Sequence, residues 1–599
     1  NGSYDFDNYG VSWTGDPIAD FVGGFWDNYY QFSNAVYDIR TGGVGVYAQD
    51  TWKVLPRLTV NLGLRYEYYI PQYDTHNEIL GYFPGTQSTV FPDAPPDILY
   101  PHDPGTPNRA LVYPDKNNFA PRFGFAWDML GNSKLVMRGG FGIFYDIEDG
   151  ALNLQFGGQP PFGAVSNIFP TSFAPGVDPI GDPFTASGYT NPFPFASRGL
   201  VGTFLSPAIP YAYTTDPHFR TPYSENFNFG FQWQMTKDMM LETVYVGSLG
   251  RKLISTAEEN FPSLPNEQYQ LATYLPAYDA GLISSPINPE CARPLAACTG
   301  GFLNPNDPQD PSGFPTGIQQ LYTNFSNGLS DSDQLQVTLD KRFSHGLSFR
   351  GAYTWAKTID LTSGFRSRSA GYTDPYDPRL DRAVADFDVP QRFVFSGIWE
   401  IPFGNHVENP IGQKFAKGWQ VNAITTFQGG QPVNLYANTN ASQQDNYLDR
   451  PNTLGPIPLT HQPRNPNQTF TSQCNGTDSG TETGNFWFNP TNLVCNPCPY
   501  DDPTCADPGD QPGIPLFTYG DVPRNALRGP GINNWDLSVV KKTTFHENKS
   551  IEFRAEFFNA FNHVQFLRVD NSGYTSPTFG QVISDRGPRL IQFGLKLYF

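Results

Sequence analysis

Apolar side chains occupy every second position in many stretches of this chain. From Leu58 to Tyr68 the even-numbered residues are leucine, valine or tyrosine, and the residues between them are polar or glycine. The same alternation recurs from Leu347 to Trp355 and from Ile551 to Phe557. Because successive side chains point to opposite faces only in a β-strand, these stretches predict strands with one apolar and one polar face.

These stretches number about fourteen, and their length of roughly ten to thirteen residues indicates their environment. A strand of a water-soluble protein has about five or six residues, whereas a tilted strand that crosses a membrane needs about nine to eleven. The stretches are therefore predicted to cross a membrane. They are expected to begin near Gly2, Gly43, Arg57, Asn118, Lys134, Tyr223, Asp238, Asp331, Leu347, Gln391, Gly418, Asn533, Lys549 and Pro588.

The connections between the stretches alternate between short and long. Short ones lie at residues 55–56, 131–133, 236–237, 344–346 and 546–548, with a longer one at 404–417. The long ones, at 70–117, 147–222, 250–330, 359–389 and 430–532, are rich in proline, glycine, asparagine and aspartate. Short turns on the periplasmic side and long loops on the extracellular side are typical of outer-membrane barrels. The sequence thus predicts an all-β fold, an antiparallel transmembrane β-barrel in the bacterial outer membrane, with residues 1–599 as one barrel domain.

Aromatic residues stand near the ends of the predicted strands, where they would form the two interfacial girdles of a barrel. A water-soluble β-sandwich or propeller would also alternate apolar and polar positions. The strand length, the unequal loops and these aromatic positions argue against that alternative. The aromatic residues are Trp52, Tyr68, Trp127, Trp233, Trp355, Trp399, Trp419 and Trp535.

Composition narrows the function. The chain has 57 acidic and 38 basic residues, a formal charge of −19, which argues against a nucleic-acid partner. No apolar run is long enough for a transmembrane helix. Neither a GxSxG nor an HExxH motif occurs, the eight histidines are scattered, and Gly139–Gly142 lies within a strand pattern, where glycines allow close packing. We therefore predict no enzyme activity, no catalytic residue, no metal site and no cofactor.

The six cysteines all lie in polar stretches rich in proline and glycine, which favours disulfides that close exposed loops in an oxidising compartment. The spacing of Cys495 and Cys498 also permits a zinc or redox site, although no neighbouring histidine or second CxxC completes a zinc set. The disulfide candidates are Cys291, Cys298, Cys474, Cys495, Cys498 and Cys505.

The charged residues of the strands are expected to face a wet interior, either as a solvated wall or as ligand contacts. They are Arg65, Glu67, Arg122, Arg138, Glu242, Asp340, Arg342, Arg350, Arg392, Glu400, Asp536, Glu552, Arg554 and Glu556. Acidic side chains also gather in the loops, where solvated charge is favoured over a calcium site because no EF-type spacing occurs. They are Asp374, Asp377, Asp381, Asp386, Asp388, Asp501, Asp502, Asp507 and Asp510.

Several strand segments resemble TonB-dependent outer-membrane receptors. VYAQDTWKVLPRLTVNLGLRYE at 46–67 resembles one of their hairpins, and FRAEFFNAFNHVQF at 553–566 resembles their penultimate strand. DFDVPQRFVFSGIWEIPFG at 386–404 and TGDPIADFVGG at 14–24 resemble the Oar-like branch. The resemblance implies a plug and a TonB-binding segment, neither of which is visible here, so both are expected upstream of Asn1, and the barrel is expected to be incomplete at its amino end.

The resemblance implies a receptor that binds a bulky extracellular ligand and moves it across the outer membrane. Its expected partners are outer-membrane lipid, the TonB complex through the upstream segment, and a surface lipoprotein. Two alternatives stay open, namely a surface adhesion or structural protein that is anchored by the barrel, and a protein-export channel.

Overall fold

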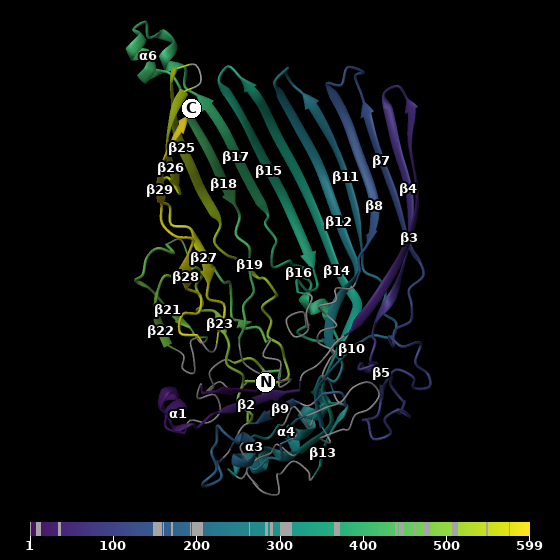
Figure 1. Ribbon diagram of the computed structural model, residues 1–599. Helices are drawn as coiled ribbons and strands as arrows, with labels where there is room; N and C mark the ends of the chain where they lie inside the picture. Colours follow the sequence, from purple (N-terminus) through teal and green to yellow (C-terminus); the bar gives the residue numbers. More distant parts are fainter. Residues whose placement is uncertain are drawn as a thin grey trace.

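One large antiparallel sheet forms the wall of the molecule in the computed structural model (Figure 1). The structure describes residues 2–599 except 7–12, 34–37, 148–158, 160, 164, 169, 171, 192, 195–207, 263, 282–284, 288–291, 300–313, 365–371, 438–440, 443–448, 461, 473, 475–479, 506–512, 547–548 and 574–575. The 16-stranded sheet has 13 strands along its main path, because β10, β13 and β16 pair only at its margin. These 13 strands are called the wall.

The wall strands follow one another in chain order, each antiparallel to the next. They are β3 (Ile39–Leu55), β4 (Leu58–Asp74), β7 (Asn118–Asp128), β8 (Leu135–Tyr145), β11 (Tyr223–Gln234), β12 (Met239–Glu258), β14 (Phe314–Ser344), β15 (Leu347–Asp360), β17 (Gln391–Glu400), β18 (Trp419–Gln428), β25 (Ile532–His546), β26 (Lys549–Phe558) and β29 (Leu590–Tyr598). Thirteen of the expected strands are therefore confirmed.

The pairing register joins the apolar positions into one continuous face. Val337 pairs with Tyr353, Tyr353 with Phe393, and Phe393 with Phe427. Residues paired across neighbouring strands lie on the same face of a sheet, so this apolar side extends from strand to strand. Phe593 is 68% exposed on it and Trp355 is 57% exposed. A water-soluble sandwich would bury such side chains, whereas a transmembrane barrel presents them to lipid.

The short and long connections emerge at opposite ends of the wall, as the sequence predicts (Figure 1). Among the described strands, the sheet ends at β3 on one side and at β29 on the other, and these two strands do not pair with each other. The wall is thus an open antiparallel sheet rather than a closed ring.

The prediction of a wall strand at Gly2 is wrong. β1 (Gly2–Asp5) pairs with β2 (Asn28–Phe32), which pairs with β9 (Val165–Ile168), in a separate sheet at the long-loop end. The ring of Tyr4 packs against those of Trp26 and Tyr29. A strand of four residues is too short to cross a membrane, and its aromatic residue contributes to a loop core instead.

The long connections fold together into a layer at one end of the wall, called the loop layer (Figure 1). All five clusters of buried apolar side chains in the described chain draw mainly on residues of these connections and of the strand ends beside them. The molecule therefore has its water-excluding core in the loops. The wall has none of its own, which fits a surface that faces lipid.

The loop layer also contains short strands and helices. Its strands are β5 (Gly81–Tyr82), β6 (Ile98–Leu99), β10 (Ala208–Thr215), β13 (Ala296–Thr299), β16 (Ala383–Val384), β19 (Pro432–Val433), β20 (Asn452–Thr453), β21 (Gln468–Ser472), β22 (Gly480–Gly484), β23 (Leu493–Val494), β24 (Leu527–Arg528), β27 (Phe566–Val569) and β28 (Val582–Asp585). Its helices are α1 (Pro17–Gly23), α3 (Pro183–Ala186), α4 (Leu264–Asp279) and the 3-10 turn η2 (Pro378–Asp381).

Two further helical segments, η3 (Pro402–His406) and α6 (Pro410–Ala416), lie at the short-turn end, in the connection between β17 and β18. β10 is an exception to the antiparallel order, since it pairs parallel with β14. Among the described helices, none is long and apolar enough to cross a membrane.

Candidate ligand-binding site

Buried ion pairs lock two long connections of the loop layer together. Two aspartates of the segment between β15 and β17, and a third at the end of β15, each pair with an arginine. All three arginines lie in the segment between β18 and β25. Arg450 Nη1 lies 2.9 Å from Asp381 Oδ1, and both side chains are 6% exposed. The pair of Arg524 with Asp360 is also buried, and in the pair of Arg528 with Asp388 only the aspartate is, since the side chain of Arg528 is 33% exposed. Buried pairs of this kind hold the loops in one arrangement, since breaking one leaves an unpaired charge away from water.

Three members of the acidic loop cluster, Asp377, Asp381 and Asp388, are thus partners of arginine. Asp386 has a different partner, because its Oδ1 accepts a hydrogen bond of 2.7 Å from Asn525 Nδ2. Asp377 pairs locally with Arg379 at the surface. In the described residues no group of three or more histidine, cysteine or acidic side chains is arranged to hold a metal ion. Asp507 and Asp510 lie outside the described residues.

Two disulfides close the segment between β18 and β25. Cys474 bonds to Cys495 and Cys498 bonds to Cys505. The cysteines of the CxxC spacing thus bond to separate partners and not to each other. Cys291 lies outside the described residues, and the side chain of Cys298 is not described, so disulfide formation by these two stays a prediction.

A buried acid lies where α4 meets the loops. The side chain of Glu267 is fully buried, and neither of its carboxylate oxygens has a hydrogen-bond partner among the described residues. Burial raises the pKa of Glu267 to about 9, although the positive charge of Arg293 acts to lower it. Glu267 is therefore protonated at neutral pH, which makes its burial tolerable.

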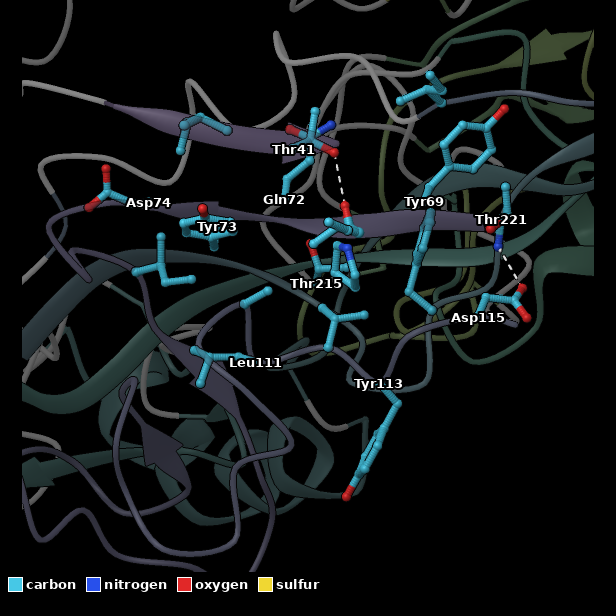
Figure 2. A pocket seen from close by; sticks show the side chains of 18 of the residues that line it. Thr41, Tyr69, Gln72, Tyr73, Asp74, Leu111, Tyr113, Asp115, Thr215 and Thr221 are labelled. Carbon is cyan, nitrogen blue, oxygen red and sulfur yellow. Dashed lines mark hydrogen bonds between the residues drawn. The ribbon is translucent and has the colours of Figure 1, made fainter. Parts of the chain in front are cut away.

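A recess opens where the loop layer meets β3 and β4 (Figure 2). Its free space, open mouth included, is about 860 Å³. Tyr69 and Tyr73 come from the end of β4, Tyr113 from the loop before β7, and Thr215 from the end of β10. The start of β3, the connection between β4 and β7 and the connection between β8 and β11 thus meet around one space.

The recess is acidic. Asp74, Asp115 and Asp146 line it, and its described lining residues include no lysine, arginine or histidine. Asp74 is satisfied internally, since its carboxylate accepts backbone hydrogen bonds from Asp38, His76 and Glu78. The carboxylates of the lining favour a positively charged or hydrogen-donating ligand, and Arg220 beside Asp115 and Arg109 over the ring of Tyr73 partly offset their charge.

Asp115 has spare bonding capacity. It is 6% exposed, and its Oδ2 accepts a hydrogen bond of 3.1 Å from the backbone nitrogen of Thr221 (Figure 2). Its Oδ1 accepts no hydrogen bond in the described structure. Arg220 Nη1 lies 3.6 Å from that oxygen, which is too long for a good hydrogen bond. Oδ1 is itself shielded from solvent, and its nearest charged partner is Arg220.

The recess connects directly to the polar face of the wall. The hydroxyl of Tyr69 donates a hydrogen bond of 2.8 Å to Glu67 Oε2, and Glu67 also pairs with Arg65 on the same strand. These three residues alternate along β4 on the side opposite Tyr66 and Tyr68. Tyr69, Glu67 and Arg65 therefore form a row of hydrogen-bonded polar side chains that begins at the recess and continues on the polar face of β4.

The charged strand residues share this polar face, as predicted, and most of their register partners are polar or small residues. Asp340 pairs in register with Arg350, and the Asp340 Oδ1 to Arg350 Nε distance is 3.6 Å. Arg554 forms its ion pair with Glu552 two residues earlier, at 2.5 Å. The residues form a charged wall, and the described structure does not gather them into one site.

The glycines at 139–142 pack closely within β8, as predicted. A Cβ added to Gly139 would lie 2.5 Å from the ring of Phe125 and 3.2 Å from the carbonyl oxygen of Asn228. Gly139 therefore leaves room for the ring of Phe125 on the neighbouring strand, and the glycines lie within a strand and not in a phosphate-binding loop.

The family is shown by a sequence comparison. The family described as "Outer membrane beta barrel domain" matches residues 1–592 of the chain. This chain is an outer-membrane β-barrel domain. Its place is therefore the bacterial outer membrane, and its apolar face meets lipid. Its short turns face the periplasm and its long loops face the outside, so the recess of this barrel domain opens on the extracellular side.

No curated protein matches the barrel domain. Among solved structures it is similar to the outer-membrane transporter YddB from Escherichia coli, with a TM-score of 0.42, 10% identity, and coverage of 96% of this chain and 50% of that one. It is also similar to the siderophore receptor PirA from Acinetobacter baumannii, with a TM-score of 0.37, 10% identity, and coverage of 93% and 46%. The copper transporter OprC gives a TM-score of 0.37, 8% identity, and coverage of 96% and 48%. The barrel domain thus spans about half the length of these proteins.

Sequence reasoning missed the residues of the recess. Asp115, Tyr113 and Thr221 stand in irregular loops, and no periodicity or motif marks them. Their only signal is position, because each lies close to the start of a strand that the sequence does predict. The carboxyl ends of long loops are thus places where a search for site residues could have begun.

Proposed function

We propose that this barrel domain is the membrane part of a TonB-dependent receptor that captures an extracellular ligand in the recess and passes it across the outer membrane. The observation that carries the proposal is the contact of Tyr69 with Glu67. It joins the extracellular recess to the polar face of the wall, which supports a route from the ligand site along that face.

The proposal includes the finer points that the sequence motifs suggest. The receptor belongs to the Oar-like branch, it couples to the TonB complex through a segment of the whole protein, and a surface lipoprotein assists it. The motifs at 14–24 and 386–404 support the branch. The ordered loop layer supports capture, because a site assembled from segments that are far apart in the sequence is held in place before the ligand arrives.

The lining indicates the chemistry of the ligand. Asp115 and Asp146 place carboxylates in the lining, and Tyr69, Tyr73 and Tyr113 offer aromatic surface with hydroxyl groups. Such a site fits a ligand with a cationic or hydroxyl-rich end and an apolar body. The carboxylate would receive the donor group, and the tyrosines would cover the body.

The test compares three strains. The first expresses the whole protein, the second lacks its gene, and the third expresses the protein but has no working TonB system. Their growth media are compared by mass spectrometry for compounds that only the first strain removes. The proposal predicts such a compound, and it predicts that Asp115→Asn weakens its removal about tenfold while Asp279→Asn, an exposed change in the same loop layer, has no effect. Removal that continues without TonB would contradict the proposal.

A second candidate function is surface adhesion with the barrel as anchor. The segment between β18 and β25 favours it, because it supplies most of a buried cluster around Leu435, Phe488 and Leu493 and contains both described disulfides. If adhesion is the function, the growth media of the three strains would contain the same compounds. Deletion of residues 438–522 would then abolish attachment of cells to a surface.

A further inference from the structure

The connection between β17 and β18 differs from the other short turns of the barrel. It holds η3 and α6, whereas the turns between β3 and β4 and between β14 and β15 have only two residues between strands. Asn409 caps the start of α6, because its side chain accepts hydrogen bonds from the backbone nitrogens of Ile411 and Gly412, and Pro410 takes the first helical position. The sequence thus specifies a helix at a point where a tight turn would suffice.

Two side chains from the apolar face of the wall hold the end of α6. Lys541 Nζ donates a hydrogen bond of 2.8 Å to the carbonyl oxygen of Lys414 and another to that of Lys417. Trp419 Nε1 donates one of 2.8 Å to the carbonyl oxygen of Phe415. These bonds satisfy carbonyls that a helix end leaves without partners.

The register shows on which side of the wall α6 is held. Lys541 pairs with Trp419 on one neighbouring strand and with Phe553 on the other. These residues belong to the apolar face, two positions from Val421 and Val539. The end of α6 is therefore fixed on the lipid side of the wall, at its periplasmic end (Figure 1).

The free surface of α6 is apolar on one side and basic beside it. Ile411 and Phe415 are four residues apart, so they share one side of the helix, and they are 70% and 73% exposed. Lys414 and Lys417 are exposed next to them. A helix of seven residues is not stable alone in water, and burying this apolar pair would stabilise it.

We propose that α6 is a membrane-interface anchor that binds the phospholipid of the periplasmic leaflet. Ile411 and Phe415 enter the boundary between headgroups and acyl chains, and Lys414 and Lys417 contact the phosphates. The anchor continues an interface that the barrel already has, because Trp399 and Trp419 stand at the same end of the apolar face, where an aromatic girdle meets the headgroups. Basic residues beside an apolar helix surface match anionic lipid.

The experiment places the photoreactive residue p-benzoylphenylalanine at position 415 of the whole protein in its native outer membrane. After irradiation, the masses of peptides with this residue are measured. The proposal predicts phospholipid adducts at about the yield of the same residue at position 399 and about tenfold above its yield at position 269, an exposed tyrosine of the loop layer. If the variant at 415 is not inserted, position 411 replaces it.

Adducts to a protein at both 411 and 415, or no adduct while position 399 gives lipid adducts, would overturn the proposal. A second measurement tests the charges. The barrel that carries Lys414→Glu and Lys417→Glu is placed in vesicles of phosphatidylcholine with or without phosphatidylglycerol. Phosphatidylglycerol is expected to increase the adduct at 415 in the parent and not in the double variant. An equal increase in both would contradict the role of the lysines, and the failure of either test would leave the proposed receptor function untouched.

Discussion

Asp381→Asn tests whether buried ion pairs hold the extracellular loops together. The carboxylate of Asp381 pairs with Arg450 across 69 residues of sequence, and it accepts hydrogen bonds of 2.7 Å from the backbone nitrogen and from the hydroxyl of Thr373. Asparagine retains the shape of the side chain and removes its charge. The guanidinium of Arg450 would then be buried without its counter-ion.

The magnitude follows from burial. Removing one partner of a buried pair costs about 3–5 kcal/mol, since the remaining charge stays away from water. Asp377→Asn is the matched control, because Asp377 pairs with Arg379 in the same segment but the side chain of Arg379 is 86% exposed. An exposed pair is worth about 0–1 kcal/mol, and asparagine can still cap the start of η2.

The assay is hydrogen exchange of the backbone amides of Thr373 and Arg450, whose protection depends on the closed loops. Because each 1.4 kcal/mol is a factor of about ten, Asp381→Asn is expected to speed exchange about 100-fold or more, and Asp377→Asn less than about fivefold. Equal exchange in the two variants would refute the reasoning, since it would show that burial of the pair does not govern loop closure.

Two more predictions concern the loop layer and the wall. The raised pKa of Glu267 means that its contribution to stability is present at low pH and is lost as pH rises toward about 9. Melting of the loop layer, followed by near-ultraviolet circular dichroism, is therefore expected to move to lower temperature between pH 6 and pH 10 in the parent, and Glu267→Gln is expected to flatten this dependence. An equal pH dependence in both would contradict it. In the wall, Val337→Arg is expected to cost about 2–4 kcal/mol in phospholipid vesicles because Val337 faces lipid, whereas Thr338→Arg on the polar face, opposite Glu242, should cost far less. Guanidinium unfolding measures both, and equal losses would count against the assignment of faces.

The wall could be predicted from the sequence because each strand carries its own alternation. β15 shows this, since every second residue from Leu347 to Trp355 is apolar or glycine and the register places them all on one face. The alternation could not predict how far a strand extends beyond the membrane. β14 begins at Phe314, well before the expected Asp331, because its first half pairs with β10 and β13 in the loop layer. Alternation of apolar and polar residues indicates a strand with one face in lipid. It does not identify the part of a strand that extends into a protein core.

The loop layer could not be predicted, because its contacts join residues far apart in the sequence. Nothing near Asp381 indicates that Arg450 is its partner, and nothing near Asp115 indicates that Tyr69 and Tyr73 line the same recess. α6 is a different case. Asn409 followed by Pro410 is a recognisable helix start, so the helix in the long turn was within reach of sequence reasoning.

The most direct test of the lipid-facing wall uses nitroxide side chains placed one at a time along β15 of the whole protein in vesicles. Collisions with oxygen, which is concentrated in lipid, are compared with collisions with a water-soluble nickel complex. At Phe349 and Tyr353 the structure predicts high oxygen and low nickel accessibility, and at Arg350 and Thr354 it predicts the reverse. Positions 349 and 353 shielded from both reagents would contradict the account, because those side chains would then be packed against protein.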